Sequence, residues 1–213
     1  MSMRPRLPWP VLRAALSTWP TLRAAAAALP LLALLACAAP SPQTQLDRLR
    51  SEARGNPAPT AAWTGPPWQL VLPVALPEYL DRDTLVVPQG QAGLRPLPGQ
   101  RWAEPLADGV TRVLRADLAA LLGESALWAG PLPPGRMPAG QLHVELTAFE
   151  ATADRSAVRL SARWSLSGAA LFSGRSEIQV PVAAPEVDAL VAAHREALWR
   201  LAGELAAALR AAR

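Results

Sequence analysis

The sequence has no lysine and little cysteine, histidine, tyrosine or phenylalanine. Its 213 residues include one cysteine, two histidines, one tyrosine and two phenylalanines. A single cysteine excludes an intrachain disulfide. The HExxH and CxxC patterns that supply metal ligands do not occur, and neither do a P-loop, a GxGxxG loop or a GxSxG elbow. The sequence thus offers no motif for a metal, a nucleotide or a nucleophilic serine, and we expect no cofactor.

The histidines and carboxylates do not form a catalytic set. His143 falls on the polar face of a predicted strand, whereas His194 falls on the apolar stripe of a predicted helix, as expected for a core histidine. The acidic residues that could pair for acid–base chemistry are scattered and are better explained by surface ion pairs; they are Glu78, Asp81, Asp83, Glu104 and Glu150. We predict a protein that is not an enzyme. The alternative is a hydrolase, which would need a pocket where a nucleophile and a base converge.

No apolar run is long enough to cross a membrane. The longest, residues 24–36, has 13 residues and contains Pro30, whereas a spanning helix needs about 20. Arginines precede this run, and no acidic residue occurs before Asp47. A basic segment followed by a short apolar run is typical of a signal peptide, which we place at residues 1–36.

The apolar run ends at the only cysteine, in the sequence Leu34-Leu35-Ala36-Cys37. This stretch resembles a bacterial lipobox, with a leucine three residues before the cysteine and a small residue directly before it. We therefore predict that Cys37 becomes the first residue of the mature chain and carries diacylglycerol and a further acyl chain such as palmitate. The alternative is an ordinary buried thiol.

Removal of residues 1–36 would leave a chain without net charge. Four of the 21 arginines precede Cys37 and all 17 acidic residues follow it, so the mature chain has 17 charges of each sign. Such a balance gives no electrostatic footprint for nucleic acid. The remaining 177 residues are enough for one domain with a sizeable core.

Residues 37–66 are rich in proline, alanine, serine and glycine, which predicts a lipidated cysteine followed by a flexible tether. A short polar helical turn is expected around residues 46–54. The alternative is that the segment packs on the domain, because Trp63 and Trp68 lie near its end. We place a single domain at residues 67–213.

The first half of this domain predicts short elements. A buried strand is expected over 68–74, a helical turn over 77–82 and a second strand over 84–87. A Gly/Pro-rich loop is expected over 89–99, with a short pairing segment at residues 94–97. Apolar residues at helical spacing predict a helix that opens within residues 101–106 and ends at Gly123. Its polar side would include Arg112, Arg115 and Asp117. Residues 124–140 read as a loop.

The second half has a clearer pattern. Apolar and polar residues alternate over 142–148, 158–166 and 172–180, which predicts an antiparallel three-strand meander with one buried face. Phe149 breaks the alternation, so a bulge is expected there. A final helix with an apolar stripe is expected over about 185–211. We predict an α/β (α+β) two-layer sandwich, in which a mixed sheet with this C-terminal meander packs against two long helices.

Two short blocks combine an aromatic residue, a proline, an acid and an arginine. They are Leu76-Pro77-Glu78-Tyr79-Leu80-Asp81-Arg82 and Arg101-Trp102-Ala103-Glu104-Pro105-Leu106. Aromatic residues and arginine are enriched at protein interfaces, so the blocks are candidate partner-binding residues. The alternative is a buried polar cluster, for example Arg82 with Glu104 and Tyr79 on Trp102.

At these blocks the chain resembles the ABC-type transport auxiliary lipoprotein (PqiC-like) family, with weaker matches at residues 144–150 and 160–164. The resemblance implies an α/β domain without known catalysis, on a lipoprotein at the periplasmic face of the outer membrane. The implied partners are an MCE-domain protein and an inner-membrane ABC-type or related transporter that moves lipids, and a homo-oligomer is compatible because MCE proteins form rings. Ala38 is not the aspartate that retains lipoproteins in the inner membrane.

One departure from the family lies soon after Cys37. Where the family has a short aromatic strand, this chain has Gln43-Thr44-Gln45-Leu46-Asp47-Arg48, so the first strand is in question. Two other functions stay open: a periplasmic lipid-modifying hydrolase, and an envelope-assembly lipoprotein without a transport role.

Overall fold

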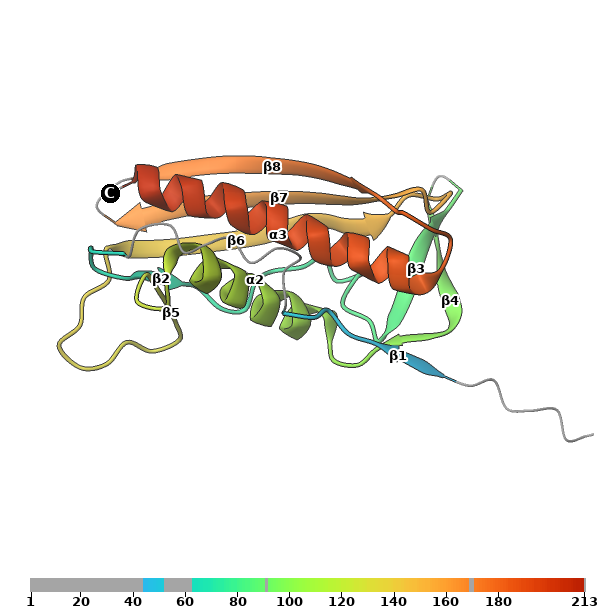
Figure 1. Cartoon of the computed structure of the whole chain (residues 1–213), viewed down its shortest axis with the longest axis horizontal. Coiled ribbons are helices and arrows are strands. Elements are labelled where there is room, and N and C mark those ends of the chain that lie inside the picture. Colours follow the sequence, from blue (N-terminus) through green and yellow to red (C-terminus); the bar gives the residue numbers. More distant parts are fainter. Residues whose placement is uncertain (1–43, 52–62, 91, 169–170, 213) are drawn as a thin grey trace, which may run out of the picture. The chain divides into compact units, whose positions relative to one another are not determined.

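The structure is a computed structural model that describes residues 44–51, 63–90, 92–168 and 171–212. The predicted signal peptide, Cys37 and most of the predicted tether lie outside these residues. The described part contains two β-sheets and two helices, labelled in Figure 1. It therefore has the α+β class that the sequence predicts.

The larger sheet has five strands in the order β5-β2-β6-β7-β8. Three of these strands, β6 (Gly140–Ala151), β7 (Ala157–Gly168) and the edge strand β8 (Phe172–Pro181), form an antiparallel meander. β2 (Trp68–Leu70) lies parallel to both β6 and β5 (Leu127–Ala129). The meander is confirmed, and so is the bulge: the register of β6 shifts between Leu146 and Ala148, which turns Phe149 into the core.

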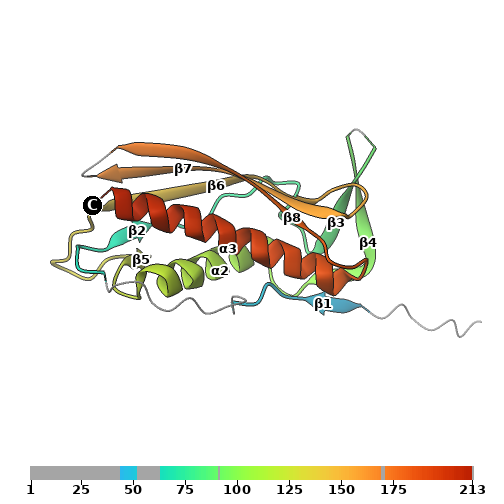
Figure 2. The ribbon, with the colours of Figure 1, turned by 45° about the horizontal axis from the view of Figure 1, so that its top comes forward.

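Helices α2 (Leu106–Leu122) and α3 (Val187–Ala211) form the second layer (Figures 1 and 2). α3 packs on β7 and β8 as well as on α2. Its buried stripe follows the predicted helical spacing and includes Leu190, Leu198, Leu201, Leu205 and Leu209. Because each layer is apolar on one side, burial of the two sides against each other stabilises the sandwich. α2 ends at Gly123, whose φ of 91° favours glycine, as predicted.

The smaller sheet was predicted only in part, as a strand over 84–87 and a short pairing segment over 94–97. It has the order β1-β4-β3, with β1 (Gln45–Asp47) parallel to β4 (Gly93–Trp102) and β4 antiparallel to β3 (Thr84–Gln89). The predicted loop over 89–99 is therefore mostly strand. Glycine and proline gave this stretch no period-two pattern, and its pairing with β3 decides its conformation.

Residues 44–51 of the predicted tether belong to the domain. Residues 45–47 form β1 instead of the helical turn expected over 46–54, and Leu49 and Trp63 are buried. The prediction of a flexible tether is therefore wrong for residues 44–51. A strand forms at Gln45–Asp47 although this stretch has no aromatic residue, because backbone pairing with β4 does not depend on aromatic side chains.

Other differences concern element boundaries. α2 begins at Leu106, and Arg101 and Trp102 end β4 instead of opening the helix. The strand expected over 68–74 ends at Leu70, and Ala75 returns to pair with Glu145. Between Leu70 and Ala75 the chain is held to α2, because the backbone N–H of Val74 donates to the hydroxyl of Thr111. β5 lies within the predicted loop 124–140, where parallel pairing with β2 holds three residues extended.

Candidate functional site

The two candidate blocks meet in space. The first forms the turn before β3, with a hydrogen bond of 2.9 Å from the N–H of Leu80 to the carbonyl of Pro77. The second joins the end of β4 to the start of α2. Asp83 connects them, because its carbonyl accepts from the N–H of Trp102 at 2.8 Å and its carboxylate pairs with Arg101 at 2.6 Å. Residues 76–83 and 101–105 thus form one surface region, which we call the joined blocks.

Two members of the joined blocks belong to the core. Leu80 is buried, and Trp102 is 8% exposed and packs edge-on against His194 with 6.0 Å between ring centroids. His194 also meets Phe149 edge-on at 4.9 Å, and its Nδ1 lies 2.9 Å from the carbonyl of Leu190. The large aromatic of the second block therefore stabilises the junction of the two sheets and is not presented to a partner.

The ion pairs differ from the predicted ones. Glu104 pairs with Arg112 of α2 instead of Arg82, whose Nε donates to the carbonyl of Tyr79. The hydroxyl of Tyr79 donates to Glu150 at 3.3 Å instead of lying on Trp102. Burial raises the pKa of this hydroxyl, and the neighbouring carboxylate raises it further. The predicted pairs, Arg82 with Glu104 and Tyr79 with Trp102, are therefore wrong. Arg101 and Trp102 belong to strand β4 and not to a helix, so the side chains of the second block lie in other directions than predicted.

The remaining candidates lie toward solvent. Pro77, Tyr79 and Glu104 are half-buried, and the exposed members are Glu78, Asp81, Arg82, Arg101 and Pro105. Four of these five carry charge, two of each sign. The exposed part of the joined blocks is thus a mixed-charge surface, of the kind that pairs with complementary charges on a partner.

The sequence analysis did not predict the contacts that Arg112, Asp117 and Arg195 make next to this region. Arg195 of α3 forms a bidentate ion pair with Asp117 of α2, with nitrogen–oxygen distances of 2.8 Å and 2.5 Å. Its guanidinium also donates to the carbonyl of Ser51 at 3.1 Å. Arg112 donates to the carbonyl of Leu49 at 2.7 Å and to the hydroxyl of Ser51 at 2.6 Å. These arginines fasten the segment after β1 to both helices.

Asp117 corrects a prediction, since the sequence placed it on the polar side of the helix. It is 1% exposed, and burial raises the pKa of its carboxyl to about 6 although Arg195 acts in the opposite direction. An acidic residue on one helix and an arginine on another give no local signal of pairing. A charge next to the apolar positions Val113, Leu114 and Leu118 was the available hint.

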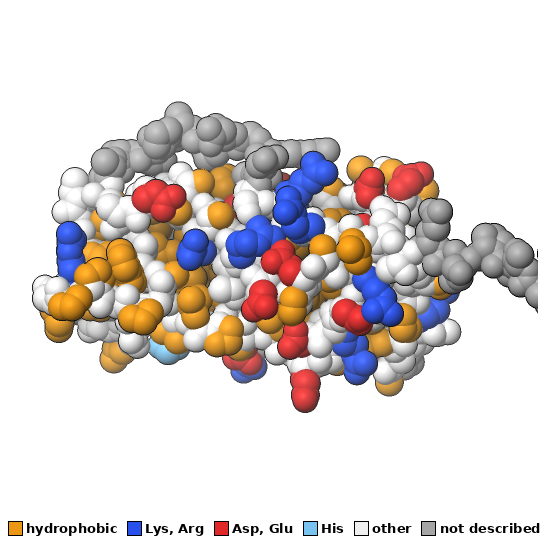
Figure 3. Space-filling model, turned by 90° about the horizontal axis from the view of Figure 1, so that it is seen from below, with side chains coloured by type: hydrophobic (Ala, Val, Ile, Leu, Met, Phe, Trp, Pro, Cys, Tyr) orange, Lys and Arg blue, Asp and Glu red, His pale blue; other side chains and the backbone are white. Residues whose placement is uncertain are grey.

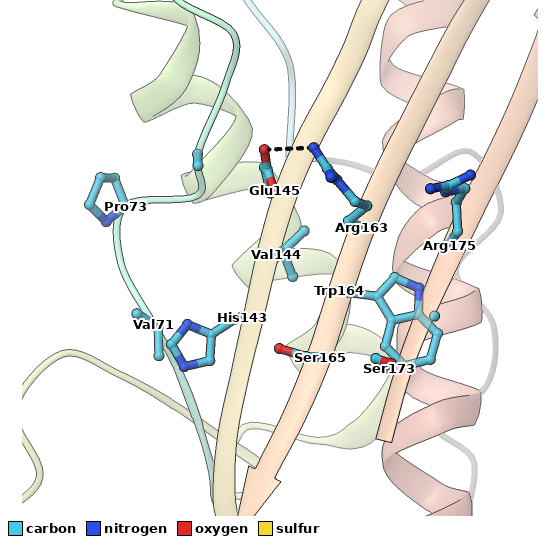
Figure 4. Close-up of a pocket in the computed structure, with 12 residues that line it drawn as sticks. Val71, Pro73, His143, Val144, Glu145, Arg163, Trp164, Ser165, Ser173 and Arg175 are labelled. Carbon is cyan, nitrogen blue, oxygen red and sulfur yellow. Dashed lines mark hydrogen bonds and ion pairs between the residues drawn. The ribbon is translucent and has the colours of Figure 1, made fainter. Parts of the chain in front are cut away.

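A groove of about 690 Å³ lies on the face of the larger sheet away from the helices (Figure 4). Val71, Pro73 and Ala75 form its apolar wall where the chain leaves β2. The floor is polar and comes from β6, β7 and β8; its residues include His143, Glu145, Arg163, Ser165 and Arg175. Arg163 and Glu145 form an ion pair of 3.3 Å.

The groove does not assemble an activated nucleophile from the described residues. His143 and Ser165 are cross-strand partners, but no hydrogen bond joins their side chains. Nor do the described residues gather three metal-ligating side chains in one place.

Apolar and charged side chains are distributed unevenly over the surface of the molecule. On the side seen in Figure 3, apolar side chains gather toward the end where β5 lies, whereas acidic and basic side chains are interspersed toward the β1 end. Exposed apolar residues of the described chain include Trp128, Met137, Leu171 and Phe172. Among the described helices, none has the length and apolar character required to traverse a bilayer.

Solved structures share the fold. A crystal structure of an uncharacterised protein is 22% identical, with a TM-score of 0.58, and the match covers 67% of this chain and 90% of that one. A Xanthomonas campestris protein assigned to the DUF330 family is 20% identical, with a TM-score of 0.54, over 78% of this chain and 90% of that one. No curated protein matches the sequence at a significant level.

The sequence matches a family model, and this match assigns the chain to a family. The model of the ABC-type transport auxiliary lipoprotein component matches residues 49–206, which is well over half of the chain. The match begins at the buried Leu49 and ends within α3, so it spans both sheets and both helices except β1. The chain therefore belongs to the ABC-type transport auxiliary lipoprotein family.

Proposed function

We propose that this protein is a non-enzymatic docking subunit of an intermembrane lipid transport system, anchored in the outer membrane by an acylated Cys37. The proposal rests on one observation, the match of residues 49–206 to a family of transport auxiliary lipoproteins. Its partners are an MCE-domain protein and an inner-membrane ABC-type transporter. The lipid supplies residence at the membrane, and the domain supplies recognition.

The anchor follows from the lipobox at Leu34–Cys37. Burial of acyl chains contributes about 0.8 kcal/mol per CH₂, so more than one chain gives stable attachment. The test is cell fractionation of the full chain and of Cys37→Ala. We expect the native protein in the outer-membrane fraction and the variant outside it. Mature-length Cys37→Ala protein that stays in the outer membrane would contradict the anchor.

The recognition surface is the exposed part of the joined blocks. Arg82 and Asp81 lie side by side in sequence on the turn, and the pair of Arg101 with Asp83 holds this turn against β4. Reversal of a charge here leaves the core intact because these side chains lie in solvent. It therefore probes recognition more cleanly than changes at the buried Trp102.

The test is co-purification of the MCE-domain protein encoded nearest to this gene. We expect Arg82→Glu with Asp81→Arg to reduce its recovery, and Arg115→Glu, an exposed arginine on α2, to leave recovery unchanged. Equal recovery with the native protein and the double variant would exclude this surface as the docking site. Lack of any co-purification with the native protein would contradict the MCE partner.

A further inference from the structure

The outer side of the smaller sheet carries leucines and arginines that face away from the core. Leu46 is 65% exposed and precedes the buried Asp47, so it points outward from β1. Leu94 is 38% exposed and stands three residues before the buried Leu97, which places it on the outward side of β4. We call Leu46, Leu94, Arg48 and Arg50 the β1 face.

The arginines of this face have no ion-pair partner within the part of the chain that the structure describes. Arg48 and Arg50 are exposed, alternate with the buried Leu49, and form no ion pair with any described residue. Arg101, the cross-strand partner of Leu46, adds a third guanidinium that is paired with Asp83. The face thus combines exposed apolar side chains with two arginines that pair with no described carboxylate.

The length of chain before β1 restricts where this face can lie. Leu46 follows Cys37 by nine residues. Nine residues span at most about 30 Å, whatever their conformation. A tether that ended only at residue 66, as the sequence suggested, would have reached about 100 Å. Because β1 belongs to the domain, a lipid on Cys37 would hold the smaller sheet close to the bilayer.

The attachment at β1 is also firm. The N–H of Ala103 donates to the carbonyl of Asp47 at 2.8 Å, and three residues of β1 pair with β4. Beyond the strand, Leu49 is buried, and its carbonyl and that of Ser51 accept from arginines of α2 and α3. The chain is therefore fixed to the fold along β1 and directly after it.

We propose that the β1 face rests on the phospholipid surface in which the acylated Cys37 is anchored. Leucine side chains enter the interfacial region of a bilayer, and guanidinium groups pair with lipid phosphates. The proposal depends on the lipid anchor of the proposed function. It adds an orientation: the smaller sheet meets the membrane, and the β7–β8 end of the larger sheet, at the other end of α3 in Figures 1 and 2, faces away from it.

The single native cysteine allows a direct test, because acylation consumes its thiol and an introduced cysteine is then the only labelling site. The mature lipoprotein is prepared as Leu46→Cys, Leu94→Cys and Arg50→Cys. Leu171→Cys serves as the matched control, since Leu171 is a leucine that is 87% exposed next to β8. Each is labelled with an environment-sensitive fluorophore and reconstituted into vesicles of phosphatidylethanolamine and phosphatidylglycerol, with detergent micelles as reference.

On transfer to vesicles we expect emission at positions 46, 94 and 50 to shift to shorter wavelength and to be quenched by lipid-borne nitroxide. The label at position 171 should show neither effect. Vesicle-bound protein in which 46 and 94 respond no more than 171 would overturn the β1 face while leaving the anchor intact. Protein that does not float with vesicles would refute the anchor itself. Shielding of position 46 that depends on protein concentration and not on lipid would assign the face to a second copy of the chain, which also overturns the proposal.

Discussion

The two sheets of this protein are held in different ways. The larger sheet is stabilised by burial: inward residues of β6 and β7 such as Leu142, Val158 and Leu160 are fully enclosed under the helices. The edge strand β1 of the smaller sheet pairs with β4, and the segment after it is held by single polar contacts, among them those of Arg112 and Arg195 with Leu49 and Ser51. Burial is spread over many side chains, whereas a polar contact depends on one residue and its geometry. We therefore expect that replacement of a single arginine can destabilise the β1 region, whereas replacement of a single residue has a smaller effect on the order of the meander.

The largest expected effect follows from breaking the buried pair of Asp117 and Arg195. Asp117→Ala leaves a guanidinium enclosed between the helices without its carboxylate, and removal of one partner of a buried pair costs about 3–5 kcal/mol. Urea unfolding measures the change. The matched control is the double variant Asp117→Leu with Arg195→Met, which removes both charges and should recover most of the loss. A single variant as stable as the native protein would show that burial alone fastens both regions.

A second prediction concerns His194, which lies where the two sheets meet, between Phe149 of β6 and Trp102 of β4. Burial lowers the pKa of His194 to about 4, against the hydrogen bond to Leu190. The unfolded chain binds this proton near pH 6.5, so acid favours unfolding. The native protein should lose about 3 kcal/mol of stability between pH 6.5 and pH 4 from this residue.

His194→Leu lacks that titration and serves as the comparison. Asp117 titrates in the opposite sense, since its raised pKa stabilises the folded state at low pH, but it is present in both proteins and cancels in the difference. Urea unfolding at pH 7, 6, 5 and 4 gives the two slopes. Equal slopes in the native protein and His194→Leu would contradict the prediction.

The smallest effects are expected from two arginines, Arg112 of α2 and Arg101 of the joined blocks. Arg112→Met removes three polar links, to Leu49, Ser51 and Glu104, and should cost about 1–3 kcal/mol. Arg101→Met removes an ion pair between half-exposed side chains and should cost about 1 kcal/mol or less. Amide hydrogen exchange read by mass spectrometry should show faster exchange over residues 45–51 in Arg112→Met. If Arg101→Met accelerates exchange over residues 45–51 as strongly as Arg112→Met does, the contacts of Arg112 with Leu49 and Ser51 are not what holds this segment.

The joined blocks show where prediction from sequence succeeded and where it failed. The blocks were recognised by composition, and they do meet through Asp83. Their partners were wrong, because Glu104 and Tyr79 bond to Arg112 and Glu150, which are distant in sequence or on another element. Composition indicates which residues form polar contacts, but the choice among several possible arginines and carboxylates depends on distances that arise when the chain folds.

The sequence by itself determined the elements whose signal is local. The three strands of the meander, the bulge before Phe149, the end of α2 at Gly123 and the stripe of α3 all followed from side-chain periodicity or from a backbone conformation that favours glycine. The tertiary structure alone decided that Gln45–Asp47 becomes a strand, that pairing extends over residues 93–102, and that Asp117 is buried. The physical reason is that strand pairing and buried ion pairs draw their free energy from partners far away in the chain, so the residues themselves do not identify those partners.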